Sequence, residues 1–273
     1  MKKVLITGST DGIGRETARV LAQQGYGILI HGRSPERVEN TVAGIKRDFP
    51  GTWCEGVTAD FSSLANVHHM AEKIMERRWL PDILINNAAV VMPRFTLSAD
   101  GYEMTFAVNH LAHFYLTLLL LDHLPGNARI INVSSMAHAS YIDFDRLNEE
   151  YRYDGVEAYS LSKLCNILFT YKLDRWLRDK KSRITVNCMH PGVINTKVLK
   201  TFWGAVGAPV KEGARTTVYL ATSPEVETVS GAYFRDAREA RTAEISYDRE
   251  VQDQCWKKSL EMLRDAGCEG MNE

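Results

Sequence analysis

Close to its start the chain reads Val4-Leu5-Ile6-Thr7-Gly8-Ser9-Thr10-Asp11-Gly12-Ile13-Gly14. The short apolar run predicts a buried strand, and the spacing of Ala18, Leu21 and Ala22 predicts a helix over residues 15–24, after the glycines. A glycine-rich turn here lets the backbone approach a pyrophosphate, which the free N–H groups and positive dipole end of the helix can bind. A tight turn without a ligand is the alternative, but the strand directly before the glycines favours dinucleotide binding.

The rest of the chain alternates between short apolar runs and amphipathic stretches. Further strands are expected at residues 28–30, 53–59, 82–85, 129–135, 184–189 and 232–234. Helices are expected at residues 35–48, 62–77, 98–121, 156–180, 211–222 and 248–266. This alternation predicts an α/β chain of one domain (1–273) with a Rossmann fold, a doubly wound parallel sheet of about seven strands with helices on both faces.

Composition excludes several classes of partner. The chain has 273 residues, 45% of them hydrophobic, and its net charge of −1 leaves no electrostatic footprint for nucleic acid. The most apolar run, Phe114 to Leu121, is too short for a membrane span and predicts a buried helix; the polar start, Met1-Lys2-Lys3, does not resemble a signal peptide. The five cysteines are odd in number and form no Cys-x-x-Cys pair, which predicts reduced thiols and a cytoplasmic location.

The second predicted strand ends at His31-Gly32-Arg33, and no acidic residue lies between Gly25 and Ser34. In dinucleotide folds an acid about 20 positions after the glycines binds the adenosine ribose hydroxyls. Arg33 could instead pair with a 2′-phosphate, or it could be a solvated loop arginine. The missing acid favours NADP(H) over NAD(H). Asp60, after the third strand, could accept a hydrogen bond from the adenine amino group or be an ordinary loop acid.

The predicted helix over 156–180 carries Tyr159-Ser160-Leu161-Ser162-Lys163. This spacing places the tyrosine and the lysine on one face. A lysine ammonium within about 4–6 Å can lower a tyrosine pKa by roughly 1–3 units from its usual value near 10, so the pair could exchange a proton with a substrate oxygen. The structural alternative is a half-buried tyrosine beside a lysine stem.

Other polar residues follow the ends of predicted strands, where ligands of parallel sheets bind. They are Asn86-Asn87-Ala88-Ala89, Ser134-Ser135 and His190-Pro191-Gly192-Val193. Asn109 interrupts an apolar helix, so it needs a local hydrogen bond or a functional role. Residues 193–210 predict a mobile substrate lid with an apolar inner surface, formed by Val198, Leu199, Phe202, Trp203 and Val206.

These motifs follow one another along nearly the whole chain, and in that order the sequence closely resembles the short-chain dehydrogenase/reductase family. The matching motifs are Thr7-Gly8-x-x-x-Gly12-Ile13-Gly14, Asp60, Asn86-Asn87-Ala88, Asn109, Ser134-Ser135, Tyr159-x-x-x-Lys163 and Pro191-Gly192 with Thr196. Within the family the chain looks most like the branch of retinol dehydrogenases and WW-domain oxidoreductases. That likeness comes from Val108-Asn109-His110-Leu111-x-His113-Phe114, Ser134-Ser135-x-x-His138, Lys163-Leu164-x-Asn166 and Gly231-x-Tyr233-Phe234-x-Asp236.

The resemblance implies a hydride transfer between nicotinamide and the carbonyl or alcohol of a fairly apolar small molecule, such as a retinal-, steroid-, aldehyde- or ketone-like compound. Tyr159 would exchange the proton, and Lys163 would lower its pKa and hold the nicotinamide ribose. Ser135, rather than Ser134, would hydrogen-bond the substrate oxygen, and Asn109 would help hold a relay water near Lys163.

The cofactor site that the resemblance implies contains Gly8, Ser9, Thr10, Asp11, Gly12, Ile13, Gly14, Arg33, Asp60, Phe61, Asn87, Ala88, Ala89, Asn109, Tyr159, Lys163, Pro191, Gly192, Val193 and Thr196. Ala89 stands where the family usually has glycine, and its methyl group is expected to alter packing without abolishing binding. No metal site is expected, because His68-His69 and His110-x-x-His113 lack a metal-binding pattern.

Two other functions fit the same scaffold. A catalytically silent NADP(H)-binding regulator would be expected to lack the tyrosine or the lysine, and this chain has both. Reduction of a C=N or C=C bond would use the same fold, because fold does not determine function. Homo-oligomerisation through the helices around Asn109 and Leu164, as in many relatives, is left open.

Overall fold

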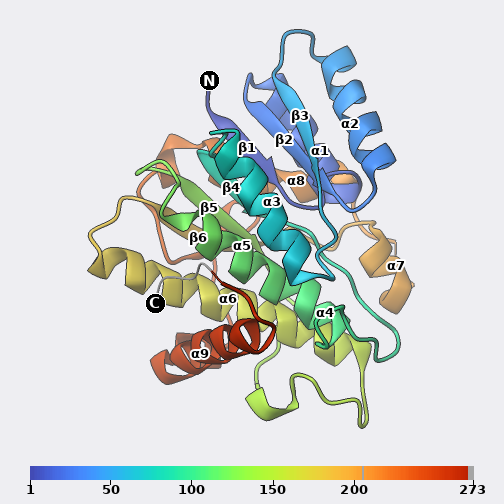
Figure 1. Cartoon of the computed structure of the whole chain (residues 1–273), viewed down its shortest axis with the longest axis vertical. Coiled ribbons are helices and arrows are strands. Elements are labelled where there is room, and N and C mark those ends of the chain that lie inside the picture. Colours follow the sequence, from blue (N-terminus) through green and yellow to red (C-terminus); the bar gives the residue numbers. More distant parts are fainter. Residues whose placement is uncertain (205, 270–273) are drawn as a thin grey trace.

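An eight-stranded sheet lies at the centre of the computed structural model, which describes residues 1–204 and 206–269 without the side chains of residues 202 and 203 (Figure 1). The strands are β1 (Lys3–Ile6), β2 (Gly27–Gly32), β3 (Cys54–Thr58), β4 (Ile83–Asn86), β5 (Arg129–Val133), β6 (Thr185–His190), β7 (Tyr233–Arg235) and β8 (Arg238–Glu239). They lie in the order β3-β2-β1-β4-β5-β6-β7-β8, and neighbours are parallel except β7 and β8. The predicted doubly wound parallel sheet is therefore confirmed.

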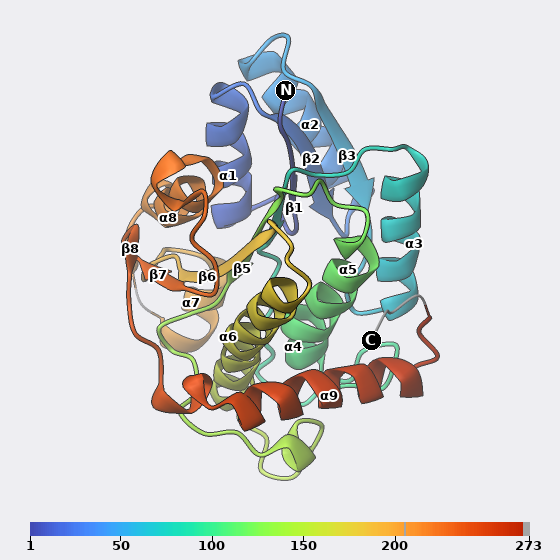
Figure 2. The same cartoon turned by 90° about the vertical axis from the view of Figure 1, so that its left-hand side faces the viewer.

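Helices cover both faces of this sheet (Figure 2). One face carries α1 (Gly12–Gln23), α2 (Pro35–Asp48) and α8 (Val210–Thr222), and the other carries α3 (Leu64–Glu76), α5 (Ala112–Leu121) and α6 (Gly155–Asp179). The short α4 (Met104–Phe106) and a π-helical turn (Ala107–Leu111) lead into α5, and α7 (Lys197–Trp203) precedes α8. The C-terminal α9 (Arg249–Asp265) packs on α6, and single 3-10 turns lie at Phe144–Arg146, Pro224–Val226 and Glu244–Tyr247.

The apolar runs of the strands are explained by burial on both sides of the sheet. Side chains alternate between faces along a strand, so Val4 and Ile6 pack with α1 while Leu5 packs with α3 and α5. The same alternation recurs in the neighbouring strands, where Leu29 and Leu84 join the cluster of Leu5. Strands buried on both faces need apolar residues at every position, which is why they were visible as short continuous runs.

Two elements differ from the sequence-based expectation. The strand β8 was not predicted, because Arg238–Glu239 is exposed and has no apolar pattern. It forms through a hairpin turn in which Asp236 and Ala237 have φ of 53° and 57°. The helix expected over 98–121 begins only at Met104, because the carboxylate of Glu103 accepts hydrogen bonds from the N–H groups of Thr105 and Phe106.

The segment predicted as a lid contains a helix. Thr196 caps α7 by accepting a hydrogen bond from the Leu199 N–H group at 3.4 Å. Val198 and Leu199 are half-buried, whereas Val206 is 91% exposed. The side chains of Phe202 and Trp203 and all of Ala205 lie outside the described residues, so the apolar inner surface and the mobility remain predictions.

The aromatic side of α5 and α6 is covered by α9 of the same chain (Figure 2). The ring of Trp256 on α9 lies 5.0 Å from Phe114 and 5.9 Å from Phe169, centre to centre. His110 hydrogen-bonds to Ser259 at 2.8 Å. This helix therefore occupies a face that the sequence left open for a dimer bundle. By length and composition the described stretch Met104–Leu121 could cross a membrane, but 94% of it is buried inside the protein.

Candidate active site

The glycine-rich turn between β1 and α1 packs tightly against the end of β4. A Cβ atom on Gly8, which has φ of +65°, would lie 2.8 Å from the Cα atom of Ala88. A Cβ atom on Gly14 would lie 2.5 Å from the Asn87 amide nitrogen and 2.6 Å from the Gly8 carbonyl oxygen. These glycines are therefore required by close approach of two backbone segments, which places the predicted residues Gly8, Gly14, Asn87 and Ala88 side by side.

Thr7 holds this junction together and was absent from the predicted site. Its hydroxyl oxygen accepts hydrogen bonds from the N–H groups of Asn87 and Ala88 at 2.8 and 2.9 Å, and it lies 2.8 Å from Nε2 of His113. The side-chain amide of Asn87 donates to the carbonyl oxygen of Thr7 at 2.7 Å. In the sequence, the only indication of this role is that Thr7 places a hydroxyl group directly after an apolar strand.

His31, at the end of β2, is a second residue that sequence reasoning did not assign to the site. Its Nδ1 accepts a hydrogen bond from the Gly8 N–H group at 3.1 Å, so its Nε2 carries the proton and donates to the carbonyl oxygen of Ala59. The ring stacks on Phe61 at 4.3 Å between centres. Burial lowers the pKa of His31 to about 4, so this neutral ring ties the glycine-rich turn to β2.

Ser135, Tyr159 and Lys163 meet where β5 ends against α6. The Lys163 Nζ atom lies 5.5 Å from the centre of the Tyr159 ring and donates to the carbonyl oxygen of Val133, the last residue of β5, at 3.0 Å. The Ser135 hydroxyl hydrogen-bonds the phenol of Tyr159. The predicted grouping of these three side chains is therefore present in the structure.

The pKa of Tyr159 differs from the sequence-based expectation, which was a value lowered by the ammonium group. Burial raises the pKa of this phenol, although its hydrogen bond with Ser135 acts in the opposite direction. Burial also lowers the pKa of Lys163 to about 8. The side chains are 9% and 2% exposed, so desolvation of the charged forms outweighs their mutual attraction, and the phenol is protonated at neutral pH.

The two serines after β5 have separate roles in the structure. The Ser134 hydroxyl donates to the carbonyl oxygen of Lys163 at 2.7 Å and so ties β5 to α6. The Ser135 hydroxyl, beside Tyr159, also accepts a hydrogen bond from the Ala137 N–H group at 3.1 Å. His138 donates from Nδ1 to the carbonyl oxygen of Ser135 at 2.6 Å, since its Nε2 accepts from the Ala243 N–H group.

Asn109 lies in the π-helical turn and is fully buried. Its side-chain oxygen accepts from the Val90 N–H group at 2.8 Å, and its amide donates to the Val90 carbonyl oxygen and to the hydroxyl of Ser162. Its backbone carbonyl accepts from Asn166 and lies 3.1 Å from Nδ1 of His113. The side chain therefore fixes the segment after β4, and its role in holding a water remains a prediction.

The predicted adenosine end is rich in charge. Arg33 follows β2, is exposed, and forms no hydrogen bond or ion pair with the other residues that the structure describes. Asp60 accepts hydrogen bonds from the N–H group and hydroxyl of Ser62, so its carboxylate also closes the turn before α3. Asp11 caps α1 and pairs with Arg37 at 3.0 Å, a residue that the sequence analysis did not single out.

The remaining predicted residues lie around the same turn. Ser9 is buried and donates to the carbonyl oxygen of Ile6, and the carbonyl of Thr10 accepts from Arg37. Thr196 lies next to Gly12, since a Cβ atom on this glycine would be 3.8 Å from the Thr196 methyl carbon. The other five residues follow strand ends or lie at the start of a helix, as expected, and are Ile13, Ala89, Pro191, Gly192 and Val193.

The histidines considered as metal ligands have other partners. His68 hydrogen-bonds Tyr115 at 2.7 Å, and His110 lies between Asn166 and Ser259. His113 contacts Thr7 and Asn109, so it belongs to the network under the glycine-rich turn.

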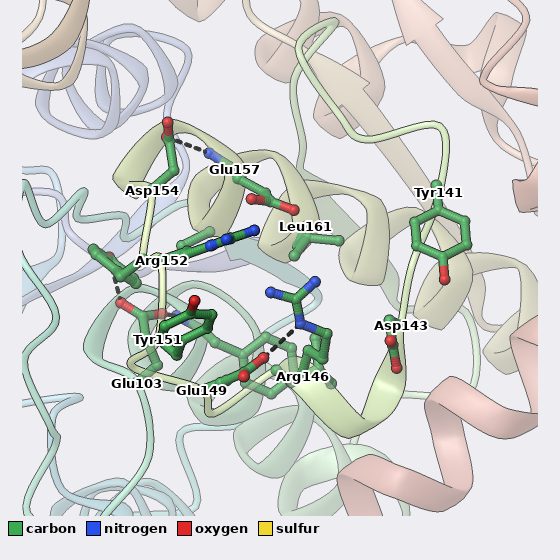
Figure 3. Close-up of a pocket in the computed structure, with 14 residues that line it drawn as sticks. Glu103, Tyr141, Asp143, Arg146, Glu149, Tyr151, Arg152, Asp154, Glu157 and Leu161 are labelled. Carbon is green, nitrogen blue, oxygen red and sulfur yellow. Dashed lines mark hydrogen bonds and ion pairs between the residues drawn. The ribbon is translucent and has the colours of Figure 1, made fainter.

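A separate cavity of about 70 Å³ opens beside the start of α6 (Figure 3). Figure 3 shows its polar rim, on which Arg146 pairs with Glu149. Neither Ser135 nor Tyr159 lines this cavity, so it is distinct from the site above. Its lining residues are Glu103, Phe106, Tyr141, Asp143, Arg146, Leu147, Glu149, Tyr151, Arg152, Tyr153, Asp154, Glu157, Ala158 and Leu161.

Comparison with known proteins agrees with this geometry. The family model described as short chain dehydrogenase matches residues 2–205. The human polyprenol dehydrogenase is 36% identical over 94% of this chain and 84% of its own length, and human retinol dehydrogenase 13 is 38% identical over 96% and 84%. The solved structure of landomycin C-6 ketoreductase LanV with bound NADP and rabelomycin is 28% identical, with a TM-score of 0.67 over 86% of this chain and 94% of that one.

The matched length and identity confirm the family and the retinol dehydrogenase-like branch that the sequence motifs indicated. An oxidoreductase of this kind uses a nicotinamide cofactor and acts on an alcohol or a carbonyl group. The chain belongs to the short-chain dehydrogenase family.

Proposed function

We propose that this protein is an NADP(H)-preferring oxidoreductase that transfers a hydride between nicotinamide and the carbonyl or alcohol carbon of a fairly apolar small molecule. The observation that carries the proposal is the meeting of Ser135, Tyr159 and Lys163 at the carboxyl end of β5. This is the edge of a parallel sheet at which ligands bind, and the glycine-rich turn opens on the same edge.

The chemistry assigned to each side chain follows from its surroundings. Tyr159 keeps its proton at neutral pH because it is buried, so it can donate that proton to a carbonyl oxygen that receives a hydride. Ser135 hydrogen-bonds the same oxygen, since its hydroxyl already lies beside the phenol. Lys163 would hold the nicotinamide ribose and compensate charge as Tyr159 loses its proton, and Asn109 would fix the backbone beside it.

The cradle for the dinucleotide fits such a cofactor. Gly12 has φ of +52° and begins α1, and a Cβ atom on it would meet only the Thr196 methyl carbon, at 3.8 Å. Free N–H groups at a helix start bind phosphate oxygens. The bound cofactor would supply the hydride, whereas the protein supplies position and charge. The remaining predicted cofactor residues are proposed as contacts because they lie around the glycine-rich turn or at the carboxyl ends of the strands.

NADP(H) is preferred in this proposal because Arg33 follows β2 where an acid would bind the ribose hydroxyls of NAD(H). Arg33 has no partner among the described residues, so its guanidinium is available to a 2′-phosphate. The bound NADP of the LanV structure supports the same choice.

An apolar substrate is supported by the side chains near the proposed reaction centre. Met136 follows Ser135 and is 53% exposed, and Val193 follows Pro191-Gly192 and is 52% exposed. Apolar side chains left open beside a site suit an apolar ligand. Two relatives are named for polyprenol and retinol, alcohols with long apolar bodies. Residues 193–210 would close over such a substrate as a lid.

We also propose that the chain is a single domain that works in the cytoplasm. Cys268 and the four buried cysteines are all free thiols, which suits a reducing compartment. Assembly through a bundle of α5 and α6 would require α9 to move, because Trp256 packs on Phe114 and Phe169.

The test is an assay of NADPH consumption with a panel of straight-chain, isoprenoid and aromatic aldehydes and ketones. We expect turnover of apolar carbonyl compounds and little turnover of small polar ones. Bound NADPH without turnover of any carbonyl compound would contradict the proposal and favour the silent regulator. Turnover of an imine or an enone double bond alone would favour the other chemistry on this scaffold.

A further inference from the structure

Asp11 connects three parts of the proposed cofactor site. Its Oδ1 atom accepts a hydrogen bond from the Gly12 N–H group at 2.9 Å and so caps α1. Its Oδ2 atom lies 3.0 Å from Arg37 Nη2 and 2.9 Å from Lys197 Nζ. Arg37 stands in the first turn of α2, and Lys197 begins α7 in the proposed lid. One carboxylate therefore joins the glycine-rich turn, the segment after β2 and the lid.

Arg37 is held on the glycine-rich turn by two contacts. Besides the carboxylate of Asp11, its Nη2 atom donates to the carbonyl oxygen of Thr10 at 3.3 Å. Thr10 in turn lies against β2, because a Cβ atom on Gly32 would be 2.6 Å from the Thr10 methyl carbon. The guanidinium thus sits between the phosphate-binding turn and the end of β2, while Arg33 nearby has no partner among the described residues.

The charge of Asp11 opposes a second anion at this place. The two cations lower its pKa to about 2, so the carboxylate is ionised throughout the physiological range. A 2′-phosphate carries two negative charges near neutrality and binds arginine better than a single carboxylate does. NAD(H) carries an uncharged 2′-hydroxyl in place of this phosphate, so its binding does not require the guanidinium of Arg37.

We propose that Asp11 limits the preference for NADP(H) by competing with the 2′-phosphate of this cofactor for Arg37. Arg33 alone then gives the basal preference for NADP(H). Arg37 increases this preference only when its ion pair with Asp11 is broken. This inference rests on the proposed function, which assigns the 2′-phosphate to the segment after β2.

The experiment measures dissociation constants of NADPH, NADH, 2′,5′-ADP and 5′-AMP by titration calorimetry. Asp11→Asn is the main variant, because asparagine caps a helix as well as aspartate does and keeps the bond to the Gly12 N–H group. Arg37→Gln and the double variant complete a cycle. Asp48→Asn is the matched control, since this carboxylate pairs with Arg47 at the far end of α2.

We expect Asp11→Asn to tighten the binding of NADPH and 2′,5′-ADP by about two- to fivefold, as loss of the exposed ion pair with Arg37 allows. The dissociation constants of NADH and 5′-AMP should stay within about twofold. Arg37→Gln should weaken NADPH by roughly fivefold and remove the gain from Asp11→Asn. Asp48→Asn should change none of the four constants.

An unchanged ratio of NADPH to NADH affinity in Asp11→Asn would overturn the inference. It would also be overturned if Asp11→Asn raised this ratio as much in the Arg37→Gln protein as in the wild type. If Asp11→Asn were to unfold, an unchanged ratio of NADPH to NADH affinity in Arg37→Gln would still overturn the inference, because Arg37 would then not contact the 2′-phosphate. A wild-type protein that binds NADH more tightly would contradict the proposed preference but not the inference, provided that Asp11→Asn still raises the ratio. Binding of neither nucleotide would overturn both.

Discussion

The ammonium group of Lys163 lies 5.5 Å from the centre of the Tyr159 ring and donates to the carbonyl oxygen of Val133. Both side chains are buried, and burial moves their pKa values in opposite directions, upward for the phenol and downward for the ammonium. The pair is therefore arranged as a protonated donor beside a cation that becomes useful when the phenol gives up its proton.

The buried ammonium is expected to cost stability. Lys163→Met should leave the free energy of unfolding at pH 7 unchanged or raise it by up to about 2 kcal/mol, because a buried charge is replaced by an apolar chain of similar length. Turnover should fall by at least about 100-fold.

The same variant gives a pH test with a definite sign. The pKa of Lys163 is about 8 in the folded protein and near 10.5 when unfolded. The cost in stability of burying the charged ammonium is therefore fully present below pH 8. It is relieved between these values, where the unfolded chain binds more protons. Urea denaturation at pH 7 and pH 9.5 should show that the unfolding free energy of the wild type rises relative to that of Lys163→Met as the pH rises. The opposite trend would contradict the account.

The two serines after β5 should separate function from structure. Ser135→Ala should lower kcat by about 100- to 1000-fold, because a hydrogen-bond donor to the reacting oxygen is lost, while NADPH binding stays within about twofold. Ser134→Ala should instead reduce stability by about 1 kcal/mol, since its bond to the Lys163 carbonyl disappears. Steady-state kinetics and thermal melting check both expectations. An equal loss of kcat in the two variants would contradict the assignment of Ser135 to catalysis and Ser134 to structure.

Asn109 should matter chiefly for the shape of the site. Asn109→Ala leaves the N–H and carbonyl groups of the half-buried Val90 without the partner they have in the fully buried Asn109, which should cost about 1–3 kcal/mol of unfolding free energy. Exposed Asn40→Ala, a control in α2, should change stability by less than about 0.5 kcal/mol. Chemical denaturation compares them, and a fully stable Asn109→Ala protein would show that the side chain does not hold this segment.

The cover provided by α9 can be measured in the same way. Trp256→Ala should lower the unfolding free energy by about 2–4 kcal/mol, because its ring packs on Phe114 and Phe169. Lys257→Ala, next to it on the exposed side of α9, should cost less than about 0.5 kcal/mol. Similar values for the two variants would mean that α9 contributes little to the core.

Much of the fold was predictable because burial on both faces leaves a simple trace in the sequence. The runs around Leu5, Leu29 and Leu84 are apolar at nearly every position, and each ends at or just before the end of its strand. The boundary at Met104 was missed, since the hydrogen bonds of the Glu103 side chain compete with a helical pattern that begins earlier.

The site was only partly predictable, for a physical reason. Tyr159 and Lys163 are close in sequence, so helical spacing alone places them together. His31 and Thr7 act through Gly8 and the Asn87 segment, which are distant in the chain, and no local pattern reports such contacts. The pKa of Tyr159 was expected to fall, but its burial depends on the whole fold, and desolvation outweighs the neighbouring charge.

The most direct test replaces Tyr159 by phenylalanine and measures NADPH binding and carbonyl reduction on the same preparation. The account predicts an NADPH dissociation constant within about threefold of the wild type, since the loss is one hydroxyl, and a turnover lower by at least about 100-fold. A Tyr159→Phe protein that binds NADPH and reduces the same carbonyl compound at the wild-type rate would contradict it.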